Sequence, residues 1–311
     1  MTIAEPIRRE PPVTADPVPL CWLDGAIVPA AAAKISVLDH GLLYGDGVFE
    51  GIRFYRRRPF RLEQHLQRLW LSARATLLTI PLNQAELTAA IEQLVAAFDA
   101  DDGYLRLVVT RGVGPLGLDP RPCTQPTVFI IADRTALVDP AARVRGARLV
   151  IAATRRLGPD GLDPRIKSLN YLNHVLARIE AAQAGADEAV LLNAAGRVAE
   201  GSVENIFMVR AGRLLTPPTT EGALAGVTRE LVLELAAQLD VPALEQPLTP
   251  YDLFTADECF LSGTGAELVP VREVDGRPLA ACPGPVFLRI DSAFQAAIMG
   301  AAIGNVERRD H

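Results

Sequence analysis

The chain has 311 residues, 49% of them hydrophobic and 22% charged, and a formal net charge of -6 at pH 7. This length favours two domains, and the composition is that of an ordinary globular protein. The acidic balance, without a dense run of basic residues, excludes the electrostatic footprint of a nucleic-acid-binding protein.

The N-terminal stretch is expected to be a disordered arm over residues 1–20. It is rich in proline and lacks the apolar core of a signal peptide, and no later stretch is apolar enough to span a membrane. We therefore expect a cytoplasmic protein without membrane contact. The cysteines have no paired spacing of the kind that binds zinc or forms a redox motif, so we expect free thiols and no metal site. They are Cys21, Cys123, Cys259 and Cys282.

Residues 21–135 are predicted to form a smaller N-terminal domain of mixed helices and strands. The Asp24-Gly25 pair indicates a hairpin, and the glycine-rich stretch 40–51 is expected to be a turn joining two strands. Asn83 and Glu86 have the spacing of a capping box at a helix start. The expected strands are 48–55, 104–110 and 127–131, and the expected helices are 62–78 and the one from Asn83 to about Phe98.

One motif in this half imitates a dinucleotide-binding fingerprint. The segment from Gly112 to Gly117 fits G-x-G-x-x-G and follows a predicted strand. The fingerprint requires a helix to begin inside it, so that the helix N-terminus receives the pyrophosphate. Pro115 and the prolines that follow it exclude that helix, so we expect a loop and no nicotinamide site.

Residues 136–147 lack periodicity and are predicted to be an interdomain linker. The larger C-terminal domain, residues 148–311, is expected to alternate short strands and helices. Its expected strands are 148–153, 188–192, 205–209 and 258–261, and its expected helices follow Asn170, run from Val227 to Gln238 and begin at Pro285.

Lysine is scarce in this chain, which makes its positions informative. Only Lys34 and Lys167 are lysines among 31 basic residues. Lysine can lose its proton and act as a nucleophilic amine, which arginine cannot do. Lys167 lies between a loop broken by glycines and prolines and a helical pattern with apolar residues at 172, 175, 176 and 179, so it is placed to enter a cleft. A solvated lysine at a helix start is the alternative, and the scarcity and the context favour a functional amine.

Further groups match what a pyridoxal phosphate enzyme needs beside an amine, namely a carboxylate for the pyridine nitrogen and donors for the phosphate. Glu200 stands at a predicted strand end beside glycine. The segment Gly226–Arg229 opens a predicted helix with free amides, and Ser262–Gly265 is a second donor-rich turn. Arg61 adds a formal positive charge. Each piece alone is more often a turn or a cap, but their joint presence around Lys167 favours this cofactor.

These segments resemble the fold type IV pyridoxal phosphate enzymes and, within them, the branched-chain amino acid aminotransferases. The resemblance extends from about Trp22 to about Phe294. Its blocks are Tyr44–Arg53, Phe60-Arg61 with His65 and Arg68-Leu69, Tyr104–Arg106, Lys167–Asn173, Glu200–Asn205, Gly226–Arg229 and Ser262–Glu267. It implies a two-domain fold of mixed α+β and α/β character, like that of D-amino acid aminotransferase. It also implies transamination between L-leucine, L-isoleucine or L-valine and 2-oxoglutarate, giving branched-chain 2-oxo acids and L-glutamate.

The resemblance also implies roles for the residues around the cofactor. Lys167 would bond covalently to the cofactor and carry a proton during catalysis. Tyr171 would contact the phenolic oxygen of the cofactor, and Glu200 would pair with its pyridine nitrogen. The implied phosphate ligands are Arg61, Val227, Thr228 and Thr264.

On the substrate side, the family combines an apolar pocket for the aliphatic chain with an arginine and a tyrosine for the distal carboxylate of glutamate. Arg106 is the implied arginine, because one pocket must accept both kinds of side chain. Gly265 stands where these enzymes often carry alanine. The matching positions are Tyr44, Phe49, Gly51, Arg53, Tyr104, Arg106 and Gly265.

Three alternatives stay open. Thr110-Arg111-Gly112 also resembles the carboxylate-binding segment of D-amino acid aminotransferases, although Tyr104 and Arg106 favour L-specificity. Aminodeoxychorismate lyases share the lysine and the glutamate but eliminate pyruvate. A cofactor-free relative would lack the activity altogether.

Family resemblance further implies a homodimer or a higher homo-oligomer. In such a dimer the active sites lie at the domain interface, and the loop 112–117 of one subunit would border the site of the other. The other partners are small amino acid and 2-oxo acid substrates.

Overall fold

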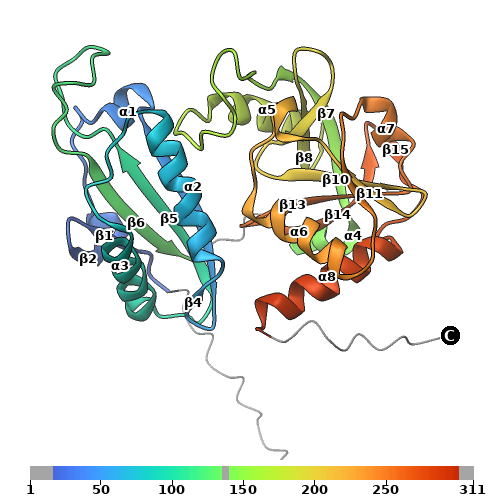
Figure 1. Ribbon diagram of the computed structural model, residues 1–311, viewed down its shortest axis with the longest axis horizontal. Helices are drawn as coiled ribbons and strands as arrows, with labels where there is room; N and C mark the ends of the chain where they lie inside the picture. Colours follow the sequence, from blue (N-terminus) through green and yellow to red (C-terminus); the bar gives the residue numbers. More distant parts are fainter. Residues whose placement is uncertain (1–16, 135–139, 301–311) are drawn as a thin grey trace, which may run out of the picture.

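The computed structural model describes residues 17–134 and 140–300, which form two β-sheets with helices packed against them (Figure 1). The first sheet belongs to the N-terminal half and is antiparallel throughout. Its strands, in spatial order, are β2 (Ala26–Pro29), β1 (Leu20–Leu23), β6 (Thr127–Asp133), β5 (Gly103–Thr110), β3 (Gly47–Tyr55) and β4 (Arg58–Pro59). Asp24 and Gly25 form the turn of the predicted hairpin.

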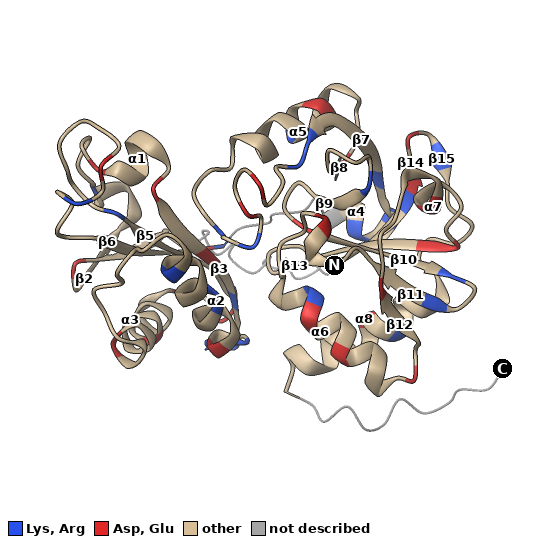
Figure 2. Ribbon diagram, turned by 45° about the horizontal axis from the view of Figure 1, so that its top comes forward, with Lys and Arg blue, Asp and Glu red and all other residues tan. Residues whose placement is uncertain are grey.

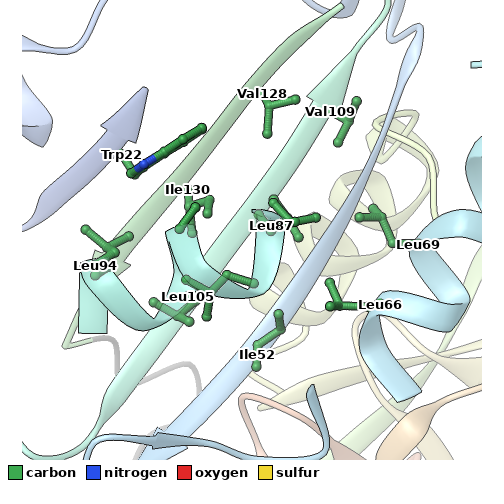
Figure 3. Packing of buried hydrophobic residues seen from close by; sticks show 14 of the residues in the cluster. Trp22, Ile52, Leu66, Leu69, Leu87, Leu94, Leu105, Val109, Val128 and Ile130 are labelled. Atoms are coloured by element: carbon green, nitrogen blue, oxygen red, sulfur yellow. The ribbon is translucent and has the colours of Figure 1, made fainter. Parts of the chain in front are cut away.

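Two helices, α2 (Leu62–Ala75) and α3 (Gln84–Ala97), pack on this sheet and form the first core. Burying each large apolar side chain there stabilises the fold by about 1.5–3 kcal/mol. The predicted capping box is confirmed: Asn83 accepts a bond from the Glu86 amide and Glu86 one from the Asn83 amide. Figure 3 shows Leu66, Leu69, Leu87 and Leu94 of the two helices packed together with Ile52, Leu105 and Ile130 of the strands.

The glycine-rich stretch 40–51 differs from the expected simple turn. It contains a short helix, α1 (His40–Tyr44), because the Asp39 side chain accepts a bond from the Gly41 amide and caps the first turn. Gly45 ends the helix in the left-handed region, at φ 69°. The chain then enters β3 directly.

The loop after β5 carries no helix within the fingerprint-like segment, as predicted. Gly112 adopts φ +86°, and a Cβ there would lie 1.8 Å from the Gln125 carbonyl oxygen. The glycine thus permits a close approach of two backbone segments.

The second sheet is mixed and belongs to the C-terminal half. Parallel pairing joins β14 to β7, β7 to β8 and β11 to β12, and the remaining neighbours are antiparallel. Its main path is β12 (Ala243–Glu245), β11 (Arg213–Thr216), β10 (Asn205–Arg210), β13 (Glu258–Gly263), β14 (Glu267–Val274), β7 (Ala147–Arg155), β8 (Glu188–Leu192) and β9 (Val198–Gly201). A short strand, β15 (Arg277–Pro278), pairs with β14.

Helices cover this sheet and complete its cores. α6 and α8 share one hydrophobic cluster with β10 and β13, whereas α5 packs on β7 and β8. The helices of this half are α4 (Pro140–Arg145), α5 (Leu172–Gln183), α6 (Val227–Gln238), α7 (Pro250–Phe254) and α8 (Pro285–Ile298). Two single 3-10 turns lie at Ala30–Ala32 and Thr219–Glu221.

The apolar face predicted for α5 does not face the core. Its four apolar residues are 46–70% exposed, namely Leu172, Val175, Leu176 and Ile179. The buried side of the helix is formed by His174, Ala177 and Ala181 instead. The small residues Ala177 and Ala181 let α5 lie close to β7 and β8. The larger apolar residues lie on the opposite side of the helix and are uncovered in a single chain.

Polar contacts join the two halves at several points. Acidic and basic positions are interspersed over both halves (Figure 2), and some of them pair across the junction. Tyr55 of β3 donates to Glu267 of β14 at 2.7 Å, and Arg53 approaches the same carboxylate at 3.4 Å. Arg61, before α2, pairs with Glu234 of α6 at 2.7 Å. These contacts set the position of one sheet relative to the other.

Two sequence expectations fall partly outside the described residues. Residues 1–16 of the predicted arm are not described, and β1 begins at Leu20. The predicted linker 136–147 contains α4 and the first residue of β7. Within the described ranges, no helix combines the length and the apolar character needed to cross a bilayer.

Candidate active site

A pocket lies between the two halves, and both sheets line it. From the first half it receives β3 and β5 residues and one arginine of α2. From the second half it receives the end of β9, the start of β10, the N-terminus of α6 and the turn after β13. The segment around Lys167 crosses between these walls. The pocket is therefore assembled from segments far apart in the sequence.

Lys167 is anchored to the first sheet through its backbone. Its carbonyl accepts the Phe49 amide at 3.0 Å, and its amide donates to the Ser72 hydroxyl at 3.1 Å. The next residue, Ser168, forms an isolated antiparallel bridge with Val48. These bonds fix the main chain, so that the Lys167 amine extends from a rigid base into the pocket.

The Lys167 amine has a specific polar neighbour. Its Nζ lies 3.1 Å from the Tyr171 hydroxyl and 4.5 Å from the centre of the Phe49 ring. Tyr171 immediately precedes α5, and its ring meets Phe49 edge-on at 5.0 Å. The arrangement brings together the lysine and the tyrosine that the sequence singled out.

Glu200 lies in β9 and is 4% exposed. Its Oε1 accepts a bond from Arg156 Nε at 2.7 Å, and its Oε2 accepts one from the Leu224 amide at 2.8 Å. Two fixed donors, one of them charged, hold this carboxylate in place. Arg156 was not predicted, because it follows β7 and reaches Glu200 only through the fold.

The opposite end of the pocket is rich in backbone donors. Val227 and Thr228 form the first turn of α6, whose leading amides have no partners within the helix. Thr264 and Gly265 lie in the turn after β13 and also line the pocket. A Cβ at Gly226 would lie 2.0 Å from Asn205 Oδ1, so a larger residue at this helix start would force the Asn205 side chain to move.

Arg61 is not at this pocket, contrary to its predicted role. It pairs with Glu234 through both terminal nitrogens, at 2.8 and 2.7 Å. The arginine that α2 contributes to the pocket lining is Arg68, whose Nη1 donates to the Ala225 carbonyl at 2.8 Å, just before α6. Arg61 is the N-cap residue that precedes α2, whereas Arg68 lies seven positions later, among the buried residues of the helix.

Arg68 belongs to a buried charge network with Glu50 and His65. It binds Glu50 through two nitrogens at 2.8 and 2.7 Å, and His65 Nδ1 lies 2.7 Å from the same carboxylate. Burial alone would raise the pKa of Glu50, but Arg68 and His65 lower it to about 2. Burial lowers the pKa of His65. The network therefore holds an ionised glutamate beneath the pocket wall.

Three buried polar atoms of the pocket lining have no hydrogen-bond partner. They are Ser202 Oγ, Ser262 Oγ and Glu204 Oε2. Burial, first of all, and then the neighbouring Glu188 carboxylate raise the pKa of Glu204 well above its usual value. Unpaired buried polar atoms are costly unless a bound molecule or water completes them.

The predicted substrate-side residues divide into two groups. Phe49, Gly51, Tyr104, Arg106 and Gly265 line the pocket. The Arg106 guanidinium lies over the Phe49 ring at 4.5 Å and beside the Tyr104 ring at 5.7 Å. No ion pair with an acidic side chain is recorded for Arg106 within the described residues, so its charge is available to a ligand carboxylate.

Tyr44 and Arg53 do not line this pocket. Arg53 faces Glu267, as described above, and Tyr44 accepts a bond from the Gly117 amide at 2.9 Å. Tyr44 is thus tied to the loop that the family resemblance places near a second subunit. Its expected contact with substrate is not made within one chain.

Arg111, the arginine of the D-specific alternative, is committed elsewhere. It donates to both oxygens of Asp46 at 2.9 and 3.0 Å and to the carbonyls of Thr76 and Leu77 at 2.8 Å. It is 8% exposed and outside the pocket lining. These four bonds give it a structural role. No cluster of potential metal ligands occurs within the described part of the chain.

Comparison with known proteins finds a family model and relatives that match most of this chain. Residues 47–274 match the family model of amino-transferase class IV. A putative branched-chain-amino-acid aminotransferase of Methanocaldococcus jannaschii is 50% identical over 256 residues, which cover 82% of this chain and 88% of the relative.

Solved structures give the same result for the fold. The branched-chain aminotransferase of Thermoproteus uzoniensis with norvaline is 39% identical, with a TM-score of 0.85 over 91% of this chain and 96% of that one. The branched-chain amino acid aminotransferase of Thermobaculum terrenum, solved in its PLP-form, is 30% identical, with a TM-score of 0.80 over 92% and 95%. The predicted fold type IV architecture is confirmed.

Proposed function

The chain belongs to the class IV aminotransferases and, within them, to the branched-chain-amino-acid aminotransferases, and on this premise we propose its substrates and cofactor. It transfers the amino group of L-leucine, L-isoleucine or L-valine to 2-oxoglutarate, giving the branched-chain 2-oxo acid and L-glutamate. The cofactor is pyridoxal 5'-phosphate. The observation that carries the proposal is the Lys167 amine beside Tyr171 in a pocket that also contains Glu200.

The donor and acceptor set of the pocket fits pyridoxal phosphate. Two of its buried atoms without a hydrogen-bond partner, Ser202 Oγ and Ser262 Oγ, line the pocket, where a bound polar molecule can form hydrogen bonds with them. When bound, the cofactor supplies an electron sink for the negative charge that develops at the substrate Cα. Glu200 would face the pyridine nitrogen and favour its protonated form, and Tyr171 would contact the phenolic oxygen.

For the phosphate we propose the N-terminus of α6 and the turn after β13. Val227 and Thr228 would donate from the first turn of α6, where the helix dipole also favours an anion, and Thr264 would donate from the turn. Arg68 replaces Arg61 as the positive charge in this proposal, because Arg68 lines the pocket and Arg61 pairs with Glu234.

Lys167 would bond covalently to the cofactor and, once displaced by substrate, carry a proton to and from the substrate Cα. Two features support this. The backbone of Lys167 is fixed to β3, so the reach of its amine is set by side-chain rotation alone. The Tyr171 hydroxyl at 3.1 Å is a partner that can exchange hydrogen bonds with the amine as its protonation changes.

The substrate side chain would lie among Phe49, Tyr104 and Arg106. Aromatic faces suit a branched aliphatic chain, and the Arg106 fork suits the distal carboxylate of glutamate. A Cβ at Gly51 would lie 2.0 Å from the Tyr104 hydroxyl oxygen, so glycine is needed there to seat that tyrosine. The commitment of Arg111 to Asp46 favours L-specificity over the D-specific alternative.

We also propose a homodimer. The exposed α5 face, formed by Leu172, Val175, Leu176 and Ile179, is an apolar surface that a second copy would cover. The loop 112–117, with Leu116 75% exposed and Tyr44 bonded to its backbone, is a second such surface. Closure of the site by this loop of the other subunit would explain why Tyr44 lies outside the pocket of its own chain.

The direct test is a half-reaction panel on the purified holoenzyme. L-Leucine, L-glutamate, D-alanine and D-glutamate are offered separately, and loss of the bound-cofactor absorbance is followed. We expect reaction with the L-amino acids and none of comparable rate with the D-amino acids. Faster reaction with a D-amino acid would contradict L-specificity, and release of pyruvate from aminodeoxychorismate would identify a lyase.

A further inference from the structure

His174 is a pocket residue to which the proposed reaction gives no role. It is the third residue of α5, is 6% exposed and lines the pocket. Its ring stacks on that of Tyr171, with centroids 4.3 Å apart and planes inclined by 15°. Because Phe49 meets the same tyrosine edge-on, the phenol ring is held by two aromatic neighbours.

A hydrogen bond fixes the orientation of His174. Its Nδ1 lies 2.5 Å from the carbonyl oxygen of Ser202, which follows β9 and thus the strand of Glu200. A carbonyl can only accept, so Nδ1 carries the proton, and in the neutral ring Nε2 is left as an acceptor. His174 therefore connects the helix start that carries Tyr171 to the strand end that carries Glu200.

The surroundings of His174 keep it neutral. Burial lowers its pKa, and the nearby cations Arg156 and Lys167 lower it further, against the opposing influence of Glu200 and of the bond to Ser202. A proton on Nε2 would add a third positive charge to this corner of the pocket. The stacked, singly protonated ring is thus the form present at neutral pH.

We propose that His174 is a positioning residue that holds the Tyr171 hydroxyl against the Lys167 amine. Its ring fixes the plane of the phenol, and its bond to Ser202 fixes the ring. The contact that it supports is the 3.1 Å approach of Lys167 Nζ to Tyr171. The inference rests on the proposed function, since Lys167 is the amine of that reaction.

Two substitutions separate the stacking of the His174 ring on Tyr171 from its hydrogen bond to Ser202. His174→Phe keeps a ring for stacking but removes the donor to Ser202, and His174→Asn keeps a donor near Nδ1 but removes the ring. Asn173→Ala is the matched control. Asn173 is the neighbouring residue of α5, its Nδ2 donates to the Arg155 carbonyl at 2.7 Å, and it does not line the pocket.

In the holoenzyme, each His174 variant should lower the half-reaction rate with L-leucine about tenfold, with the substrate dissociation constant changed less than about twofold. The pH midpoint of the bound-cofactor absorbance should also shift, whereas Asn173→Ala should leave both unchanged. In a Tyr171→Phe background the His174 substitutions should have no further effect, because the positioned hydroxyl is gone. Additive losses in that background, or an unchanged pH midpoint, would overturn the proposal.

A second readout does not depend on turnover. The full chain without cofactor is treated with a trace of acetic anhydride at a series of pH values, and acetylation of Lys167 is measured relative to that of exposed Lys34 by mass spectrometry. We expect His174→Phe to displace the pH profile of Lys167 and leave that of Lys34 in place. An undisplaced profile refutes the positioning role. An unreactive wild-type holoenzyme would instead refute the proposed function, and the labelling result would still decide on His174.

Discussion

Two arginines near the start of α2 have different partners: Arg68 lines the pocket and binds Glu50, whereas Arg61 pairs with Glu234. Lys167, Tyr171 and Glu200 were identifiable because an amine, a phenol and a carboxylate stood in recognisable segments. Arg61 was predicted to bind the phosphate. The motif that contains it continues into α2, and the arginine of α2 that lines the pocket is Arg68. The spacing of His65, Arg68, Leu69 and Ser72 was the available signal, because these residues mark the buried face of α2.

Arg156 illustrates a limit of a different kind. It approaches Glu200 only because β7 and β9 flank β8 in the second sheet, and this pairing across 44 positions leaves no local pattern. The pair Glu188 and Glu204 also leaves no local pattern in the sequence. The pKa of Glu204 is raised by its burial and by Glu188, and residue spacing reveals neither.

Comparing Arg61 with Arg68 tests the revised phosphate site. Arg61→Ala removes a partly exposed ion pair with Glu234 and should leave cofactor affinity within about threefold, because such pairs contribute little. Arg68→Lys keeps the charge but loses the planar fork that binds Glu50 and Ala225, so cofactor affinity should fall by about tenfold or more, on the order of one charged hydrogen bond. Fluorescence titration of the cofactor-free chain measures both. Loss of affinity with Arg61→Ala alone would return the role to Arg61.

Arg106 should be selective between substrate classes. Arg106→Ala should weaken reaction with L-glutamate by about 2–3 kcal/mol, the range for a lost charged hydrogen-bonded partner, and affect L-leucine much less. The comparison uses the half-reaction rate constant divided by the dissociation constant for each substrate, so that a general defect is not mistaken for selectivity. Equal losses for both substrates would exclude Arg106 as the carboxylate ligand.

At the scale of elements, local signals located most helices and strands, and their ends were set by capping and by the fold. α3 begins where its capping box predicted, and α6 has the predicted bounds. α1 was missed because a helix of five residues has too few positions to show a period, and its cap, Asp39, is the main cue. The helical spacing of the apolar residues of α5 was found, but periodicity does not say whether such a face packs within a chain or between chains.

The cap of α3 offers a stability test remote from the site. Asn83→Ala removes the acceptor for the Glu86 amide and should lower the free energy of unfolding by about 1 kcal/mol. Asn83→Ser, which can also cap, should restore most of the loss. Urea unfolding followed by circular dichroism provides the measurement, with the half-reaction rate expected to be unchanged. A rate loss as large as that of an active-site variant would show that α3 influences the pocket.

For the whole molecule, the exposed face of α5 predicts how copies associate. Ile179→Asp places a charge in the proposed contact and should shift a dimer toward monomer, because an unpaired carboxylate is costly to bury. Val144→Asp on α4, at a position 82% exposed and remote from that face in the sequence, is the control and should leave the assembly intact. Sedimentation velocity at low concentration distinguishes them. An unchanged sedimentation coefficient for Ile179→Asp would remove α5 from the interface.

The central claim is that Lys167 is the covalent anchor of the cofactor, and reduction with borohydride tests it most directly. The holoenzyme is reduced and digested, and the peptide carrying the cofactor is identified by mass spectrometry, with Lys34→Arg as the matched control. Since the chain has only two lysines, the assignment has two possible answers. We predict label on the peptide containing Lys167, in the wild type and in Lys34→Arg alike, and none in Lys167→Ala. Label recovered at Lys34, or no covalent attachment in a cofactor-loaded enzyme, would contradict it.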